Sequence, residues 1–179
     1  ITPPLGYRMA GYFSERRNTG TRDPLLAKAI VFEQGSVKAA LVECDMVSMP
    51  GDAAAKARAA AEKATGIPAG HISVAATHSH TGPLFTGPLA KLWSEQAAAK
   101  KEKDSATEFD YPAMLIEKVT QAIAQAAKNA RPVTLSAGAI EETRLSFNRR
   151  FFMKDGSVRF NPGRLNPNIV RVAGPIDPQ

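Results

Sequence analysis

The chain is poor in cysteine and lacks long hydrophobic runs. Its single cysteine, Cys44, excludes an internal disulfide, and its place inside an apolar stretch predicts a buried structural thiol. No apolar run approaches the ~18 residues that a membrane-spanning helix requires. Basic residues are scattered and are not interleaved with aromatics, which argues against nucleic-acid binding despite a formal charge of +6. An anionic membrane surface or lipid headgroup fits this charge equally well.

The composition is that of an ordinary globular protein. The 179 residues are 44% hydrophobic and 22% charged, which is enough to bury a sizeable core. We therefore expect a single domain over residues 1–179.

The order of the predicted elements indicates an α/β fold. Strands are predicted over 27–33, 37–44 and 72–76, and a helix over 53–64. The turn sequence Gln34-Gly-Ser36 joins the first two strands into a hairpin, and Asp52 is a candidate cap for the helix. The strand–helix–strand order that follows predicts a mixed β-sheet flanked by helices.

The second half of the chain is less regular. Apolar residues at three- and four-residue steps predict a helix over 110–130, and the polar segment 93–108 is typical of a partly exposed helix or a mobile flap. A strand is predicted over 133–139, and a small hairpin over 151–160. Residues from 161 onward are rich in Pro, Gly and Asn, so we expect them to form loops.

Two of the three histidines, His78 and His80, lie two residues apart directly after the predicted strand 72–76. Because alternate residues of an extended segment point the same way, both imidazoles can converge on one point. Ligands gather beyond the carboxyl ends of strands in α/β sheets, and imidazole is a common metal ligand and acid–base group. The simpler alternative is a pair of polar loop residues. By its position at the start of the strand, His71 is expected to be a surface residue.

Several short motifs resemble, in the same order, the N-terminal part of the neutral/alkaline (non-lysosomal) ceramidase family. They are Ile1-Thr-Pro-Pro-Leu-Gly-Tyr7 with Gly11-Tyr12, Asp23-Pro-Leu-Leu-Ala-Lys-Ala29, Glu43-Cys-Asp-Met46, Ala76-Thr-His-Ser-His-Thr-Gly-Pro83, and Phe147-Asn-Arg-Arg150 with Asn161-Pro162. The Thr-His-x-His-x-Gly-Pro segment is the most specific of them.

The resemblance implies a Zn²⁺-dependent amidohydrolase. It makes His78 a ligand of the catalytic zinc. It makes His80 a catalytic group that contacts the reacting amide or its oxyanion, and Arg149 a catalytic group that lines the site. Arg150 stands where the family has a serine. The alternative for Arg149, without the resemblance, is a charged residue exposed to solvent in a turn. The family takes its other zinc ligands from sequence beyond this segment, so we expect a fragment of a longer catalytic domain that neither binds zinc tightly nor hydrolyses anything alone.

The same resemblance implies an N-acyl sphingoid substrate such as ceramide, peripheral membrane contact, and a secreted, cell-surface or periplasmic location. Two other interpretations stay open. One is another metal-dependent hydrolase with an HxH pair, although Thr81-Gly-Pro-Leu-Phe85 lacks the acidic residue and histidine typical of metallo-β-lactamases. The other is a non-catalytic domain that binds lipid or carbohydrate, in which the histidines are polar lining.

Overall fold

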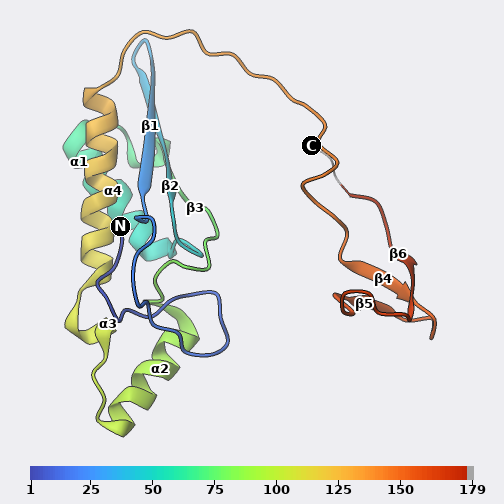
Figure 1. Cartoon of the computed structure of the whole chain (residues 1–179). Coiled ribbons are helices and arrows are strands. Elements are labelled where there is room, and N and C mark those ends of the chain that lie inside the picture. The colour runs from blue at the N-terminus through green and yellow to red at the C-terminus, as the bar shows by residue number, and fades with distance from the viewer. Residues whose placement is uncertain (177–179) are drawn as a thin grey trace. The chain divides into compact units, whose positions relative to one another are not determined.

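The computed structural model describes residues 1–176, which form two compact units (Figure 1). The first unit comprises Ile1–Pro132, and the second begins at Val133. The sequence predicts one domain, whereas the described residues divide into these two units. That both belong to one longer catalytic domain stays a prediction.

The first unit carries all the helices of the described residues. Its elements are β1 (Ala27–Gln34), β2 (Val37–Cys44), α1 (Gly51–Thr65), a 3-10 turn (Ala69–His71), β3 (Ile72–Ala76), α2 (Gly87–Lys100), α3 (Ser105–Glu108) and α4 (Tyr111–Lys128). The second unit is a small antiparallel sheet of β4 (Arg150–Met153), β5 (Val158–Phe160) and β6 (Ile169–Val172). Within residues 1–176, no helix is both long enough and apolar enough to cross a bilayer.

The sheet of the first unit has the order β1-β2-β3 and is mixed, as predicted. The strands β1 and β2 form an antiparallel hairpin whose turn contains Gly35 at φ +59°, a conformation that glycine adopts without strain. After α1 the chain returns as β3, which pairs in parallel with β2. This arrangement confirms the α/β class and brings the carboxyl ends of β2 and β3 to the same edge of the sheet.

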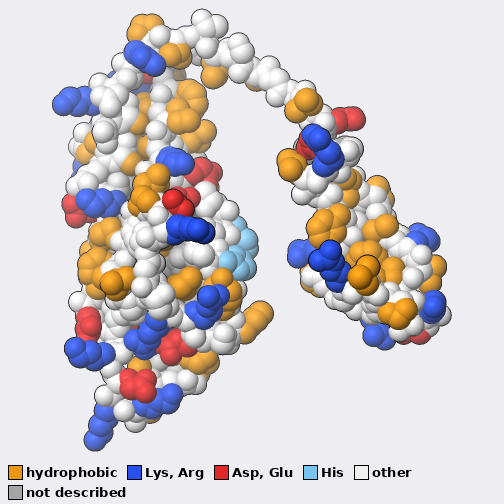
Figure 2. Space-filling view, viewed as in Figure 1, with side chains coloured by type: hydrophobic (Ala, Val, Ile, Leu, Met, Phe, Trp, Pro, Cys, Tyr) orange, Lys and Arg blue, Asp and Glu red, His pale blue; other side chains and the backbone are white. Residues whose placement is uncertain are grey.

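The core lies between one face of this sheet and the helices α1 and α4, which run side by side in Figure 1. Its buried residues include Ala40, Val42 and Cys44 of β2, Ala57 and Ala61 of α1, and Leu115, Val119 and Ile123 of α4. The small alanine side chains let α1 approach α4 closely. The other face of the sheet is open, with Ile30 58% and Leu41 50% exposed, and Figure 2 shows hydrophobic side chains at the surface of this unit.

Some of the predicted elements are wrong. Residues 133–139 form no strand, and Val133 and Leu135 are each 76% exposed. An alternating apolar pattern becomes a strand only where another strand pairs with it, and none among the described residues does so. Conversely, the sequence predicts a loop where β6 forms. This segment is a strand because β4 offers a hydrogen-bonding edge, which the local sequence does not reveal.

The helix boundaries also differ in detail. The segment predicted as a partly exposed helix or flap is divided between α2 and the short α3. The residue preceding α1 is Pro50, so Asp52 lies in the first turn and makes no capping hydrogen bond. At α4 the carboxylate of Asp110 does cap the helix, accepting a hydrogen bond from the backbone N–H of Ala113 at 3.0 Å.

Candidate functional site

The histidine loop, residues 77–83, follows β3 at the edge where β2 also ends. Its backbone continues the strand pairing: the N–H of Thr77 donates to the carbonyl of Cys44 at 3.0 Å, and the N–H of Ser79 donates to the carbonyl of Met46 at 3.1 Å. Gly82 packs so closely that a Cβ there would lie 2.6 Å from the Cα of Met46. The loop is therefore held against the segment that follows β2.

The ring of His78 is fixed by one backbone hydrogen bond. Its Nδ1 lies 2.8 Å from the carbonyl oxygen of Val47. Because a carbonyl only accepts, Nδ1 carries the proton in the neutral ring, and Nε2 presents a lone pair. The backbone of His78 has φ +62°, in the left-handed region where histidine is enriched among non-glycine residues. The hydrogen bond to the Val47 carbonyl is of the kind that orients metal-binding histidines.

The second histidine brings its own ring to the same point. The Nε2 atoms of His80 and His78 are 3.3 Å apart, and the ring centroids are 4.9 Å apart. The predicted convergence is confirmed, although the left-handed turn at His78, rather than an extended backbone, produces it. Figure 2 shows histidine side chains open to solvent on the first unit.

The donor atoms fit a zinc ion. The lone pair on Nε2 of His78 can bind zinc at ~2.0–2.1 Å, and Nε2 of His80, 3.3 Å from it, is close enough to reach a group bound to the same ion. A catalytic zinc has three protein ligands. Within residues 1–176, no group of three or more His, Cys, Asp or Glu side chains is placed to hold a metal.

The N-terminal segment supports the histidine loop from the other side. The N–H of Ala10 donates to the carbonyl of Gly82, and the N–H of Leu84 donates to the carbonyl of Arg8, both at 2.8 Å. Gly11, at φ +89°, lies against His80 so closely that any Cβ would overlap the imidazole. Gly11-Tyr12 is one of the motifs that resemble the ceramidase family, but the contact of Gly11 with His80 could not be predicted from residue spacing.

Arg8 anchors this segment through a buried ion network that no sequence pattern predicts. Its side chain is 1% exposed and donates to Glu15 at 2.7 Å and Asp104 at 2.5 Å, with further hydrogen bonds to Ser94 and to the carbonyl of Trp93, each at 3.1 Å. Burial raises the pKa of Asp104, but hydrogen bonds from Ser94 and the Ala106 backbone and the charge of Arg8 outweigh it and hold the pKa below its ordinary value.

Arg149 belongs to the second unit. Its guanidinium lies over the ring of Phe160, 4.7 Å from the centroid, and its carbonyl accepts a hydrogen bond from Asn161 at 2.9 Å. The preceding Asn148 accepts a hydrogen bond from the Arg150 N–H at 2.9 Å, which shapes the entry into β4. A meeting of Arg149 with the two histidines stays a prediction.

Three other residues of the quoted motifs, and His71, have structural roles. Asp45 accepts hydrogen bonds from the Leu26 N–H at 2.9 Å and from the Thr77 hydroxyl at 3.4 Å, so its carboxylate holds the strand ends together. His71 is exposed, as predicted, and bonds to a backbone carbonyl. Tyr7 is buried in the core, and Cys44 is a buried thiol whose pKa burial raises to about 11.

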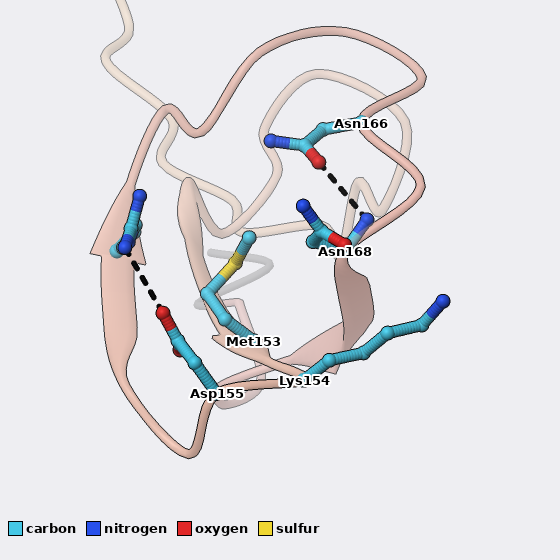
Figure 3. Close-up of a pocket in the computed structure, with 6 residues that line it drawn as sticks. Met153, Lys154, Asp155, Asn166 and Asn168 are labelled. Carbon is cyan, nitrogen blue, oxygen red and sulfur yellow. Dashed lines mark hydrogen bonds and ion pairs between the residues drawn. The ribbon is translucent and has the colours of Figure 1, made fainter.

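A polar pocket of about 380 Å³ lies in the second unit (Figure 3). Its groups bond to one another: Arg159 pairs with Asp155 at 3.0 Å, and the side chain of Asn166 accepts from the N–H of Asn168 at 2.9 Å. These bonds form the turns around β4 and β5, so the pocket is explained by the local fold.

Comparisons with models of known protein families, with curated proteins and with solved structures find no match for this chain. Its function is therefore inferred from the quoted motifs and from the geometry of the histidine pair.

Proposed function

We propose that this chain supplies the first residues of the active site of a zinc-dependent hydrolase that cleaves an N-acyl amide bond in a lipid such as ceramide. The observation that supports the proposal best is the pair of Nε2 atoms 3.3 Å apart, with the His78 ring oriented by the carbonyl of Val47 at 2.8 Å. Ligands gather at the carboxyl ends of strands in α/β sheets, and a metal held there by His78 would supply the activated water and the polarised carbonyl that amide hydrolysis needs.

The two histidines have different roles in this proposal. His78 would bind zinc through the lone pair on Nε2, while its Nδ1–H keeps its hydrogen bond to the carbonyl oxygen of Val47. A bound zinc lowers the pKa of its water to roughly 7 and polarises the acyl carbonyl. His80, whose exposed ring adjoins the same point, would donate a hydrogen bond from Nε2 to the amide oxygen, and Arg149 would be a second donor to the developing negative charge, as the ceramidase resemblance implies.

The other zinc ligands are proposed to come from residues outside these 179. Cys44 and Asp45, at the end of β2, are not suited to the role. The Cys44 thiol is buried and stays protonated at neutral pH because its pKa is raised to about 11. Asp45 already has both carboxylate oxygens engaged. The proposal includes contact with a membrane surface and a location outside the cytoplasm, as the ceramidase resemblance implies.

The test uses a longer version of the chain that continues beyond Gln179, with zinc content and release of fatty acid from ceramide as the two measurements. We expect His78→Ala to lose both zinc and activity. We expect His80→Ala to retain zinc within a few-fold but to lose activity by about 10²–10³-fold, as for loss of an oxyanion donor. The matched control His71→Ala, at an exposed histidine remote from the pair, leaves both unchanged.

Equal loss of zinc in His78→Ala and His80→Ala would make His80 a second ligand rather than a hydrogen-bond donor. A longer protein that binds neither zinc nor any other divalent metal would contradict the enzyme proposal and favour a non-catalytic lipid- or carbohydrate-binding domain.

A further inference from the structure

A second candidate site lies beside the histidine loop but does not include the histidines. It is a cavity of about 630 Å³ in the first unit, bounded by residues 16–25 and by Ser79 and Thr81, the alternate residues of the loop. Neither His78 nor His80 lines it. The loop thus borders a separate cavity that the proposed zinc chemistry leaves unused.

The cavity has a surplus of positive charge with free hydrogen-bond donors. Its charged lining residues are Arg8, Arg16, Arg17, Arg22, Asp23 and Asp45. The Arg8 guanidinium is occupied by Glu15 and Asp104, and Arg17 bonds partly to Glu15. By contrast, the Arg16 guanidinium lies over the ring of Tyr12, 4.2 Å from its centroid, and within residues 1–176 neither Arg16 nor Arg22 forms an ion pair.

The backbone of residues 19–22 adds further hydrogen-bond donors to the cavity. Residues 19–22 all line the cavity, and their N–H groups have no acceptor in the part of the chain that the structure describes. A polar ligand in the cavity therefore finds hydrogen-bond donors in the backbone as well as in the arginine side chains. Of the two carboxylates, Asp45 is occupied by the Leu26 N–H and the Thr77 hydroxyl, which leaves Asp23 as the one opposing charge without a partner among the described residues.

We propose that this cavity binds an oxyanion, a phosphate or sulfate group, through the guanidinium groups of Arg16 and Arg22. A volume of about 630 Å³ is much larger than one phosphate, so the group would be carried on a larger organic molecule or lipid. Guanidinium binds such groups with two parallel hydrogen bonds, and each bond is strengthened by charge. The site is independent of the zinc chemistry proposed above.

The test is titration of the full chain with inorganic phosphate at constant ionic strength, followed by calorimetry or by amide chemical shifts. We expect saturable binding that Arg22→Gln and Arg16→Gln each weaken at least about fivefold, since a charge-assisted hydrogen bond is lost. The matched control is Arg131→Gln, which removes the same charge from an exposed residue outside the cavity and should change binding less than about twofold. Asp23→Asn should strengthen binding, because it removes the opposing charge.

Vesicles of phosphatidylcholine with and without phosphatidic acid distinguish the source of the group. Binding to phosphatidic acid that inorganic phosphate displaces and Arg22→Gln weakens identifies a lipid headgroup. Phosphate binding without vesicle binding identifies a soluble ligand. The proposal is overturned if phosphate does not saturate, or if Arg131→Gln weakens binding as much as Arg22→Gln does. A third result also overturns it: the chain binds calcium, Asp23→Asn abolishes that binding, and phosphate does not bind. The cavity would then be a cation site.

Discussion

The buried guanidinium of Arg8 provides the sharpest test of how the histidine loop is supported. Replacing it with the apolar side chain of Met leaves Asp104 buried without its cation, and one oxygen of that carboxylate already has no hydrogen-bond partner among the described residues. Removing one partner of a buried ion pair costs about 3–5 kcal/mol. Because Glu15 is 31% exposed and can be solvated, we expect the lower end, about 3 kcal/mol.

The assay is urea unfolding followed by the fluorescence of the single tryptophan, Trp93, and by circular dichroism. For a unit of this size, about 3 kcal/mol corresponds to a melting temperature lower by about 10 °C. The control Arg131→Met, at an exposed arginine, should change stability by less than about 0.5 kcal/mol. The double variant Arg8→Met with Asp104→Asn should be more stable than Arg8→Met alone, because no uncompensated charge remains.

The effect of Arg8→Met should also depend on pH. The pKa of Asp104 in the folded protein is below its ordinary value, so the carboxylate stabilises the fold above that ordinary value, and this stabilisation is lost as the pH falls through the lowered pKa. The difference between the native protein and Arg8→Met should therefore shrink in acid. A loss below about 1 kcal/mol at neutral pH, or a double variant less stable than Arg8→Met, would show that Arg8 is not needed to compensate the buried carboxylate.

Three other perturbations test the packing of the same unit. Gly11→Ala should displace His80 and lower stability by about 1–2 kcal/mol, because the φ of +89° disfavours alanine and its Cβ overlaps the imidazole; chemical shifts of the ring measure the displacement. Burial raises the pKa of Cys44 from 9.0 to about 11 and the pKa of Tyr7 from 10.0 to about 12, so between these values each group is protonated only in the folded state. The free energy of unfolding should therefore fall as the pH rises from 9 to 12, and denaturant titrations across this range measure the fall. Leu115→Ala should cost about 2–5 kcal/mol in urea unfolding, since the side chain is 1% exposed in the core.

Sequence patterns predicted the elements of the first unit because those patterns are local. Turn residues or periodic apolar positions within a short stretch of sequence predict three of them: the hairpin at Gly35, the alanine-rich helix α1 and the amphipathic helix α4. The strand β6 and the absence of a strand over 133–139 depend on which edges are available for pairing, and that information is not local.

The candidate site shows the same division. Spacing and the preceding strand predicted that His78 and His80 would meet, but not the left-handed backbone at His78 that brings their rings together. Two other contacts join segments far apart in sequence, so no local pattern predicts them: the hydrogen bond from His78 to Val47 and the contact of Gly11 with His80. Arg8 carries no sequence signal at all, because an arginine is ordinarily exposed and becomes buried only where tertiary structure supplies both Glu15 and Asp104.

Whether His78 binds a catalytic metal can be decided by anomalous diffraction at the zinc absorption edge, from a crystal of the longer protein grown with zinc. We expect a peak about 2.0–2.1 Å from Nε2 of His78, with the Nδ1 of that ring still on the carbonyl of Val47. A zinc bound elsewhere, with the His78 ring making no contact with any metal, would contradict the proposed function.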